Sequence, residues 1–277
     1  MITADDFGAA AEVNEAVEQA HCEGVLTAAS LMVGAPAAAD AVARARRLPG
    51  LGVGLHLVLT DGTPVLPPER VPALVDGRGR FRDDLAGLGA GIFFSPGARA
   101  QAAAEISAQF EAFAASGLTL DHVNGHRHFH LHPTIAAMTR RIGPRFGMRA
   151  VRWPIEPPSV LARAEGAPAV TLQGLAASLA ARLGRRVWRR AGVLIPDQVF
   201  GMAWSGAMSS GRLAALIEGA PAGLTEIYLH PATSGAFPGA AGGYAYAEEL
   251  AALLSDAARA AVGASSVRLG RFADFSS

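Results

Sequence analysis

Short apolar runs alternate with segments of helical periodicity along this whole chain. That alternation is typical of β-α units, in which parallel strands are covered by helices. The predicted strands are 1–4, 25–33, 52–59, 118–123, 149–152, 198–204 and 223–229, and a run at 267–269 is a candidate for closing the sheet. About seven strands interleaved with helices predict an α/β fold, specifically an irregular (β/α) barrel of the TIM type rather than an open doubly wound sheet.

The predicted helices also favour a single domain. The first is marked by Val13, Val17 and Ala20 and ended by Gly24, and the others span 37–47, 98–115, 134–142, 172–190, 212–218 and 247–261. Between 60 and 97 the periodicity fails, and the prolines and glycines there predict a long loop. Because no linker divides the 277 residues, we expect one domain, 1–277, with this loop as an insertion.

Composition restricts the partners and the location. The chain is 51% hydrophobic and 17% charged, which predicts a packed globular protein, and its net charge of zero argues against nucleic acid as a partner. The single Cys22 cannot form an intramolecular disulfide, and no apolar run is long enough to span a membrane, so we expect a cytoplasmic protein. Met1 lies only four residues before Asp5, so either the first strand is short or the natural start lies upstream.

Polar residues follow several predicted strands, at the end where barrel enzymes place catalytic groups. Asp5 and Asp6 end the first strand, and Gly8 permits a sharp exit from it. One of two adjacent carboxylates can bind a metal while the other remains free as a base. The alternative is that one of them caps the next helix.

Two single histidines have open interpretations. His56 is the only imidazole of the strand 52–59, where it is either a hydrogen-bonded core residue or a metal ligand. His230 follows the strand 223–229 and precedes Pro231, a position that suits a structural or a catalytic residue. Either histidine becomes a functional candidate only if the ends of these predicted strands lie close together.

The strongest signal is a histidine cluster. Five of the eight histidines of the chain lie between His122 and His132, after a predicted strand and before a helix. An extended backbone would project the alternating imidazoles to one side, where they could bind Zn, Fe, Ni or Cu, although a solvated histidine-rich turn is the alternative. Asp6, His56 and one cluster histidine would leave open metal positions, which fits a hydrolytic Zn or Mg site as well as a non-haem iron centre.

Four segments in this order resemble the YdjC-like deacetylases, which include chitooligosaccharide deacetylases. They are Ala4-Asp5-Asp6-Phe7-Gly8, Gly54-Leu55-His56-Leu57, the histidine-rich run before Pro133, and Leu229-His230-Pro231. The run from Asn124 to Pro133 is most similar to the subgroup associated with hopanoid biosynthesis. Asn124 and Arg127 stand where many relatives have an aspartate and a histidine.

This resemblance implies an irregular (β/α) barrel that hydrolyses the N-acetyl group of an N-acetylglucosamine-type sugar with a divalent metal ion, Zn or Mg. It implies Asp6, His56 and His126 as metal ligands, Asp5 as general base and His230 as general acid. The residues that it places at the sugar are His128, His130, Arg152 and Glu156.

The resemblance also suggests partners. The substrate would be an N-acetylated amino sugar or a glycolipid, such as an N-acetylglucosaminyl hopanoid, and a homo-oligomer is compatible with the family. Phe81, Phe93 and Phe94 in the 60–97 loop are candidates for covering a sugar, or are anchors of a surface loop. The arginine-rich segment 179–190 is either a solvated helix face or a peripheral contact with the inner face of a membrane.

Other readings of the same residues are a chitooligosaccharide deacetylase, a metal-dependent phosphoesterase, an iron oxygenase and a metal-binding protein. An oxygenase with this ligand set usually has a β-sandwich. A phosphoesterase is expected to have a second metal with further carboxylates, and no clear set of these is present in the sequence.

Overall fold

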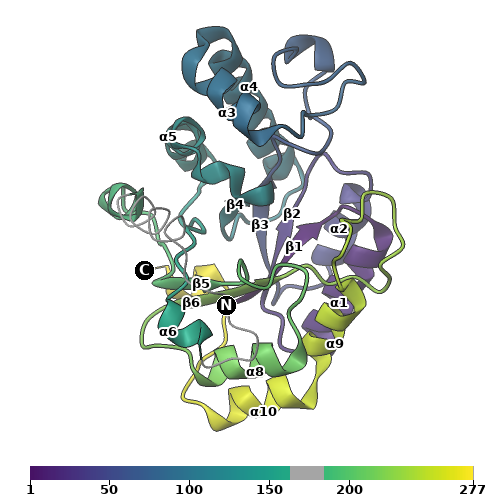
Figure 1. Cartoon of the computed structure of the whole chain (residues 1–277), viewed down its shortest axis with the longest axis vertical. Coiled ribbons are helices and arrows are strands. Elements are labelled where there is room, and N and C mark those ends of the chain that lie inside the picture. Colours follow the sequence, from purple (N-terminus) through teal and green to yellow (C-terminus); the bar gives the residue numbers. More distant parts are fainter. Residues whose placement is uncertain (163–183, 277) are drawn as a thin grey trace.

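A parallel β-sheet forms the centre of the molecule. The computed structural model describes residues 1–162 and 184–276, and its sheet has six strands in the order β4-β3-β2-β1-β6-β5. They are β1 (Ile2–Phe7), β2 (Ala28–Leu31), β3 (Gly52–Leu57), β4 (Val123–Gly125), β5 (Gln198–Phe200) and β6 (Thr225–Leu229). The first strand is central: Thr3 is in register with Ala28 on one side and with Tyr228 on the other. Figure 1 shows the sheet curled, with helices around it.

Helices surround the sheet (Figure 1), and four of those described begin at a capping side chain. Among the helices are α1 (Ala11–Glu23), α2 (Ala38–Ala45), α3 (Leu85–Phe94), α4 (Pro96–Ala115), α5 (Pro133–Ile142), α6 (Pro158–Leu161), α8 (Ser210–Glu218), α9 (Tyr246–Leu254) and α10 (Asp256–Ala264). Asp84, Ser95, Ser209 and Ser255 each accept a hydrogen bond from a backbone N–H in the first turn of the helix that follows. Within the described part of the chain, no helix is both long and apolar enough to cross a membrane.

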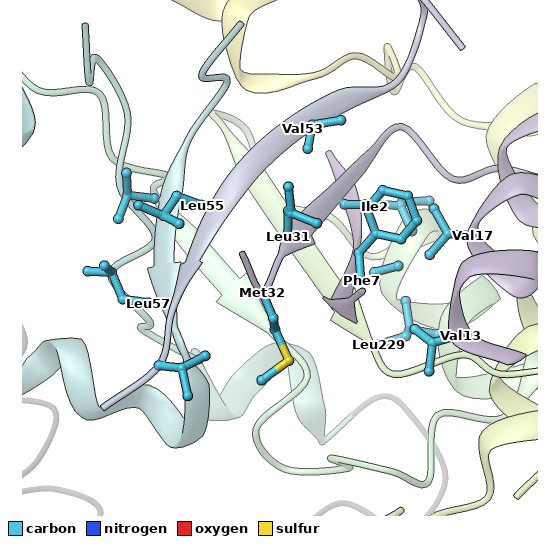
Figure 2. Packing of buried hydrophobic residues seen from close by; sticks show 14 of the residues in the cluster. Ile2, Phe7, Val13, Val17, Leu31, Met32, Val53, Leu55, Leu57 and Leu229 are labelled. Carbon is cyan, nitrogen blue, oxygen red and sulfur yellow. The ribbon is translucent and has the colours of Figure 1, made fainter. Parts of the chain in front are cut away.

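The core lies between the sheet and its helices. Ile2, Phe7 and Leu229 are buried residues of the central strands, and Figure 2 shows them near Val13 and Val17 of α1. The spacing of the last two is one helical turn, which places both on the face that packs against the sheet. The periodicity used to predict this helix is therefore the pattern that builds its contact with β1 and β6.

The α/β fold with a parallel sheet is confirmed, whereas a closed barrel of seven strands is not shown. The segment predicted as the strand 149–152 makes only isolated parallel bridges, Val123 with Val151 and Ala150 with Leu194, so the six strands form a curled half-barrel. Pro154 follows at once, and because proline has no backbone N–H it cannot extend such a ladder. The run 267–269 is not a strand.

Other boundaries also differ from the predictions. The 60–97 segment is not irregular throughout, because it contains α3, whose glycines and apolar residues hid the helical period. The strand predicted at 118–123 begins only at Val123. The helix predicted at 247–261 is two helices, since Ser255 has extended dihedrals and caps α10. Of the helix predicted at 172–190, residues 184–190 are helical, and the remainder lies outside the described residues.

We predict that Gly54→Ala destabilises the fold. A Cβ on Gly54 would lie 2.5 Å from ring atoms of the buried His122, which strand β3 could accommodate only by shifting. Overpacking of this kind typically costs about 1–3 kcal/mol, measurable as the free energy of unfolding in urea.

Gly91→Ala is the matched control. Gly91 lies in the interior of α3 with no heavy atom within 4 Å of an added Cβ, so alanine there should leave stability unchanged or raise it by up to about 1 kcal/mol. Equal unfolding free energies for the two variants would mean that the interior around His122 adjusts without cost.

Candidate functional site

A cavity of about 920 Å³ lies where the polar strand ends meet. Side chains from four strands or the residues that follow them line it, and these are Asp5, Asp6, His56, His126, His128, Tyr228 and His230. The carboxyl ends of parallel strands share one edge of a sheet, which explains why segments more than two hundred residues apart converge there. Every predicted catalytic and metal-binding residue lines this cavity.

A backbone distortion brings both aspartates to the cavity. Consecutive residues of a regular strand point to opposite faces, so Asp5 and Asp6 would normally diverge. Asp6 instead has a φ of +63°, and the pairing of β1 with β2 shifts register between Ala4 and Phe7. Aspartate tolerates this left-handed region better than most residues do, but a positive φ at Asp6 still means that the backbone is locally strained at the site.

Asp6, His56 and His126 form a group that could hold a metal ion. The Oδ1 atom of Asp6 lies 3.2 Å from Nε2 of His56 and 3.1 Å from Nδ1 of His126. One ligand atom from each of the three residues lies within 4.8 Å of the others. The structure thus brings together the three residues that the sequence predicted as ligands.

The hydrogen bonds of His56 fit a metal ligand. Its Nδ1 lies 2.8 Å from Oδ1 of Asn124, and because an amide oxygen only accepts, Nδ1 carries the hydrogen. Nε2 then has its lone pair directed toward Asp6, and this buried atom has no hydrogen-bond partner. An imidazole fixed on one nitrogen and vacant on the other is the usual arrangement of a ligating histidine. The donor set therefore fits a divalent ion, with positions left for water and substrate.

Asp5 is buried in a dense set of donors. Its Oδ1 accepts hydrogen bonds from Ser30 Oγ, Asn124 Nδ2 and Arg152 Nη2, while its Oδ2 accepts from Arg152 Nη1. Burial alone would raise the pKa of Asp5, but the charge of Arg152, its hydrogen bonds and the nearby His56 hold that pKa well below its usual range. Asp5 is thus a carboxylate throughout the physiological pH range.

Arg152 is buried beneath the cavity rather than exposed in it. Its side chain is 0% exposed, and besides Asp5 it contacts Glu226 Oε1 through Nε at 2.9 Å and Nη2 at 2.7 Å. The guanidinium also lies 4.3 Å from the ring centroid of Tyr228. Arg152 does not line the cavity, so its predicted contact with a sugar has no support from the cavity lining.

Glu156, also predicted at the sugar, holds a loop instead. Its carboxylate accepts hydrogen bonds from the backbone N–H groups of Gly201, Met202 and Ala203. Burial raises the pKa of Glu156, although these three donors oppose the shift. Met202 lines the cavity and Glu156 does not, so the carboxylate acts on the cavity wall through the backbone.

The histidine cluster is not extended, as had been expected, but forms a 3-10 turn over His126–Leu131. Arg127 and His128 have positive φ angles, which makes the imidazoles diverge. His128 Nε2 lies 2.8 Å from the hydroxyl of Tyr228, and burial lowers the pKa of His128 well below its usual value. His130 Nε2 lies 2.8 Å from the carbonyl oxygen of Arg152, and burial lowers its pKa to about 4. His132 lies outside the cavity lining.

His230 lines the cavity in edge-on contact with Tyr228 and Tyr244. Its backbone N–H donates to Glu249 Oε2, while its Nδ1 is buried without a partner. The residue lines the cavity, so its imidazole can meet a bound molecule.

Several residues of the site were not assigned a role from the sequence. Ser30, Asn124 and Glu226 hold Asp5 and Arg152, and Tyr228 lines the cavity. A usable signal was present at Glu226, because a carboxylate within an otherwise apolar, buried strand requires a buried partner. Ser30 gave no such signal, since a serine in a strand is unremarkable.

The 60–97 segment contributes to the rim, but not through its phenylalanines. Asp61 and Arg80 line the cavity. Phe81 is buried in the core, whereas Phe93 and Phe94 are exposed at the end of α3 and are not among the lining residues. The prediction that these rings cover a sugar therefore has no support here.

We predict that Zn²⁺ binding requires His126 but not His132. His126→Ala removes one of the three predicted ligands and should weaken Zn²⁺ binding by at least about a hundredfold, as measured by titration calorimetry. His132→Ala removes a histidine of the same cluster that lies outside the cavity, and should bind Zn²⁺ as the unaltered protein does. An equal loss in both variants would contradict a site built on Asp6, His56 and His126.

We also predict that Arg152→Met destabilises the fold strongly. It leaves Asp5 and Glu226 as buried carboxylates without their cation, which typically costs about 3–5 kcal/mol in unfolding free energy. Arg44→Met is the comparison, because Arg44 pairs with Glu18 and Asp40 at a partly exposed position and should cost about 1 kcal/mol or less. Similar losses would mean that the buried cluster contributes no more than surface pairs do.

The sequence of this chain is similar to those of known proteins. The model of the family described as YdjC-like protein matches residues 1–264. A carbohydrate deacetylase of Brevibacillus brevis is 40% identical over 154 residues, which are 56% of this chain and 58% of that protein. A carbohydrate deacetylase of Geobacillus stearothermophilus is 38% identical over 158 residues, or 57% and 58% of the two chains. The match therefore spans somewhat more than half the length of these curated relatives.

A solved structure from Enterococcus faecalis V583, for which cellobiose-phosphate cleavage has been suggested, superimposes with a TM-score of 0.77. The match covers 100% of this chain and 98% of the other at 22% sequence identity. At that identity the likeness establishes a shared fold.

Proposed function

Because this chain belongs to the YdjC-like protein family, we propose that it is a metal-dependent carbohydrate deacetylase, which hydrolyses the N-acetyl group of an N-acetylglucosamine-type sugar. The observation that carries the proposal is the group Asp6, His56 and His126 in the same cavity as the buried carboxylate of Asp5. The carbohydrate deacetylases of Brevibacillus brevis and Geobacillus stearothermophilus, which match part of the chain, support the substrate class.

The proposed metal is Zn²⁺ rather than Mg²⁺. Two of the three ligands are imidazoles, which suit zinc, whereas magnesium is bound mainly by oxygen atoms. When bound, the ion would acidify a water molecule and polarise the acetyl carbonyl group. Asp6 Oδ1, His56 Nε2 and His126 Nδ1 are the atoms positioned to hold it.

Asp5 is the proposed general base, acting through Oδ2. Oδ1 accepts from three donors, whereas Oδ2 accepts only from Arg152 and so retains an accepting position. Its depressed pKa keeps the carboxylate ionised but also weakens it as a base, so proton transfer to Asp5 would require a water acidified by the metal ion. Since Arg152 fixes both oxygens, Asp5 does not need to be reoriented for each turnover.

His230 is the proposed general acid. The nitrogen of an amide does not leave as a free anion, so a proton must reach it as the carbon–nitrogen bond breaks. His230 lines the cavity, which makes its imidazole a candidate donor to the departing sugar amine. His128 and His130 belong to the proposed sugar-binding region, of which His128 lines the cavity directly.

For the acceptor we propose an N-acetylglucosaminyl hopanoid ahead of a chitooligosaccharide. Met202, Phe237 and Tyr244 add apolar surface to the cavity lining, which suits the non-sugar part of a glycolipid. The arginine-rich segment 179–190 would then contact the inner face of a membrane. In its described portion, Arg185 and Arg189 pair with Asp197, whereas Arg186 and Arg190 are exposed. Self-association remains a prediction of the family resemblance.

The decisive experiment measures acetate release from N-acetylglucosaminyl bacteriohopanetetrol and from diacetylchitobiose, with Zn²⁺, with Mg²⁺ and without metal. We expect metal-dependent release by the unaltered protein. Asp5→Asn should lower kcat by at least about a hundredfold while the metal content is unchanged, because it removes the base but no ligand.

The relative kcat/KM values of the two substrates decide the acceptor. If the folded, metal-loaded protein releases acetate from neither, the deacetylase proposal fails, and hydrolysis of p-nitrophenyl phosphate would then test the phosphoesterase alternative.

A further inference from the structure

Asp121 and His122 are a buried pair of ionisable residues that the proposed reaction does not use. They precede β4 and lie away from the cavity lining, at 5% and 0% exposure. His122 Nδ1 lies 2.9 Å from Asp121 Oδ2. Burying such a pair is costly unless all of its polar atoms have hydrogen-bond partners, so the other contacts of Asp121 and His122 indicate the role of the pair.

His122 continues a hydrogen-bonded chain that reaches Asp5. Its Nε2 lies 3.0 Å from Ser30 Oγ, and Ser30 Oγ lies 3.1 Å from Asp5 Oδ1. Asn124 Nδ2 donates to the same serine oxygen at 2.8 Å. The contacts thus run without interruption from Asp121 to the proposed base.

A count of hydrogens links His122 to this serine. The carboxylate of Asp121 only accepts, so Nδ1 of His122 carries a hydrogen. Ser30 has one hydroxyl hydrogen, which it donates to Asp5 when Nε2 of His122 also carries a hydrogen, and to Nε2 when that nitrogen does not. The orientation and hydrogens of the His122 ring therefore determine whether Ser30 supports Asp5.

The C-terminal tail, Arg271–Ser276, holds the other end of the chain. The backbone N–H groups of Phe272 and Ala273 donate to the two oxygens of Asp121 at 3.3 and 2.9 Å. The buried ring of Phe272 stacks on His122 with centroids 4.3 Å apart and planes 21° apart. These residues follow the part of the chain that the family model matches, which ends at 264.

Strand β3 leaves room for this arrangement. A Cβ on Gly52 would lie 2.7 Å from Asp121 Oδ2, and one on Gly54 would lie 2.5 Å from the ring of His122. Neither glycine has a positive φ, so the absence of a side chain, rather than backbone freedom, is what these positions supply.

We infer that the C-terminal tail is a positioning element for the active site, which acts through Asp121, His122 and Ser30 to orient the carboxylate of Asp5. Neither the tail nor Asp121, His122 or Ser30 lines the cavity. The inference rests on the proposed role of Asp5 as base in deacetylation.

The first test is Ser30→Ala in the metal-loaded full chain, with acetate release as the assay. The variant breaks the chain next to Asp5 and should lower kcat about tenfold or more, with KM and metal content unchanged. If the unaltered protein is inactive, the proposed function fails. If it is active and Ser30→Ala retains its kcat, the positioning inference fails while the function stands.

The second test is a double-mutant cycle with the tail. Phe272→Leu removes the stacking on His122 and should lower kcat in the unaltered background, but not further in Ser30→Ala, because both act on one path. Phe110→Leu is the control for loss of a buried, stacked phenylalanine, since Phe110 packs on Phe146, and it should not change kcat. Multiplicative losses in the cycle would show that the tail acts through general stability and would overturn the inference.

A readout independent of activity is the ¹H–¹⁵N NMR signal of the His122 Nδ1–H group, which faces Asp121 and should be slow to exchange. We expect it to shift or broaden in Phe272→Leu and to be unchanged in Phe110→Leu. An unchanged signal in Phe272→Leu would mean that the tail does not hold His122.

Discussion

One buried guanidinium organises the centre of this molecule. Arg152 binds Asp5 of β1 and Glu226 of β6, two adjacent strands, from a segment that pairs with the sheet only through isolated bridges. A cation placed between two carboxylates lowers the cost of burying all three, and its side chain reaches from a segment bridged to β4 as far as β1 and β6. The ion cluster therefore ties this segment to the central strands, where regular strand pairing is absent, and it orients Asp5 in the same way.

The strain in this fold is concentrated at the cavity. In the described residues, four positions other than glycine have a positive φ, and these are Asp6, Asp61, Arg127 and His128. All four line the cavity. Such conformations persist only where surrounding contacts impose them, and the dense packing around Asp5 and the histidine turn supplies those contacts.

The sequence was sufficient to predict features that depend on local pattern. Periodicity identified α1 and the central strands, and the family resemblance identified Asp6, His56 and His126, which the structure brings together. The family membership itself is confirmed. The roles of Asp6, His56 and His126 in catalysis and metal binding remain predictions.

Features that depend on non-local contacts could not be predicted. The histidine run looked extended, but its two left-handed residues are imposed by contacts with Tyr228 and the backbone of Arg152, which no sequence window contains. Arg152 itself was placed at the sugar because nothing in its segment shows that Glu226, seventy-four residues later, would bury it. The number of strands was overestimated for a similar reason, since a short apolar run does not show whether its backbone can pair with a neighbouring strand.

The contact between Gly54 and His122 also limits how such a chain can change over generations. A larger residue at position 54 fits without strain only after the imidazole at position 122 has been replaced by something smaller, whereas the reverse order passes through an overpacked intermediate. The two positions, far apart in sequence, should therefore drift as a pair, and a lineage that has lost the imidazole would be released from the need for glycine in β3. The residue at position 54 would then indicate whether a lineage has kept the imidazole at position 122.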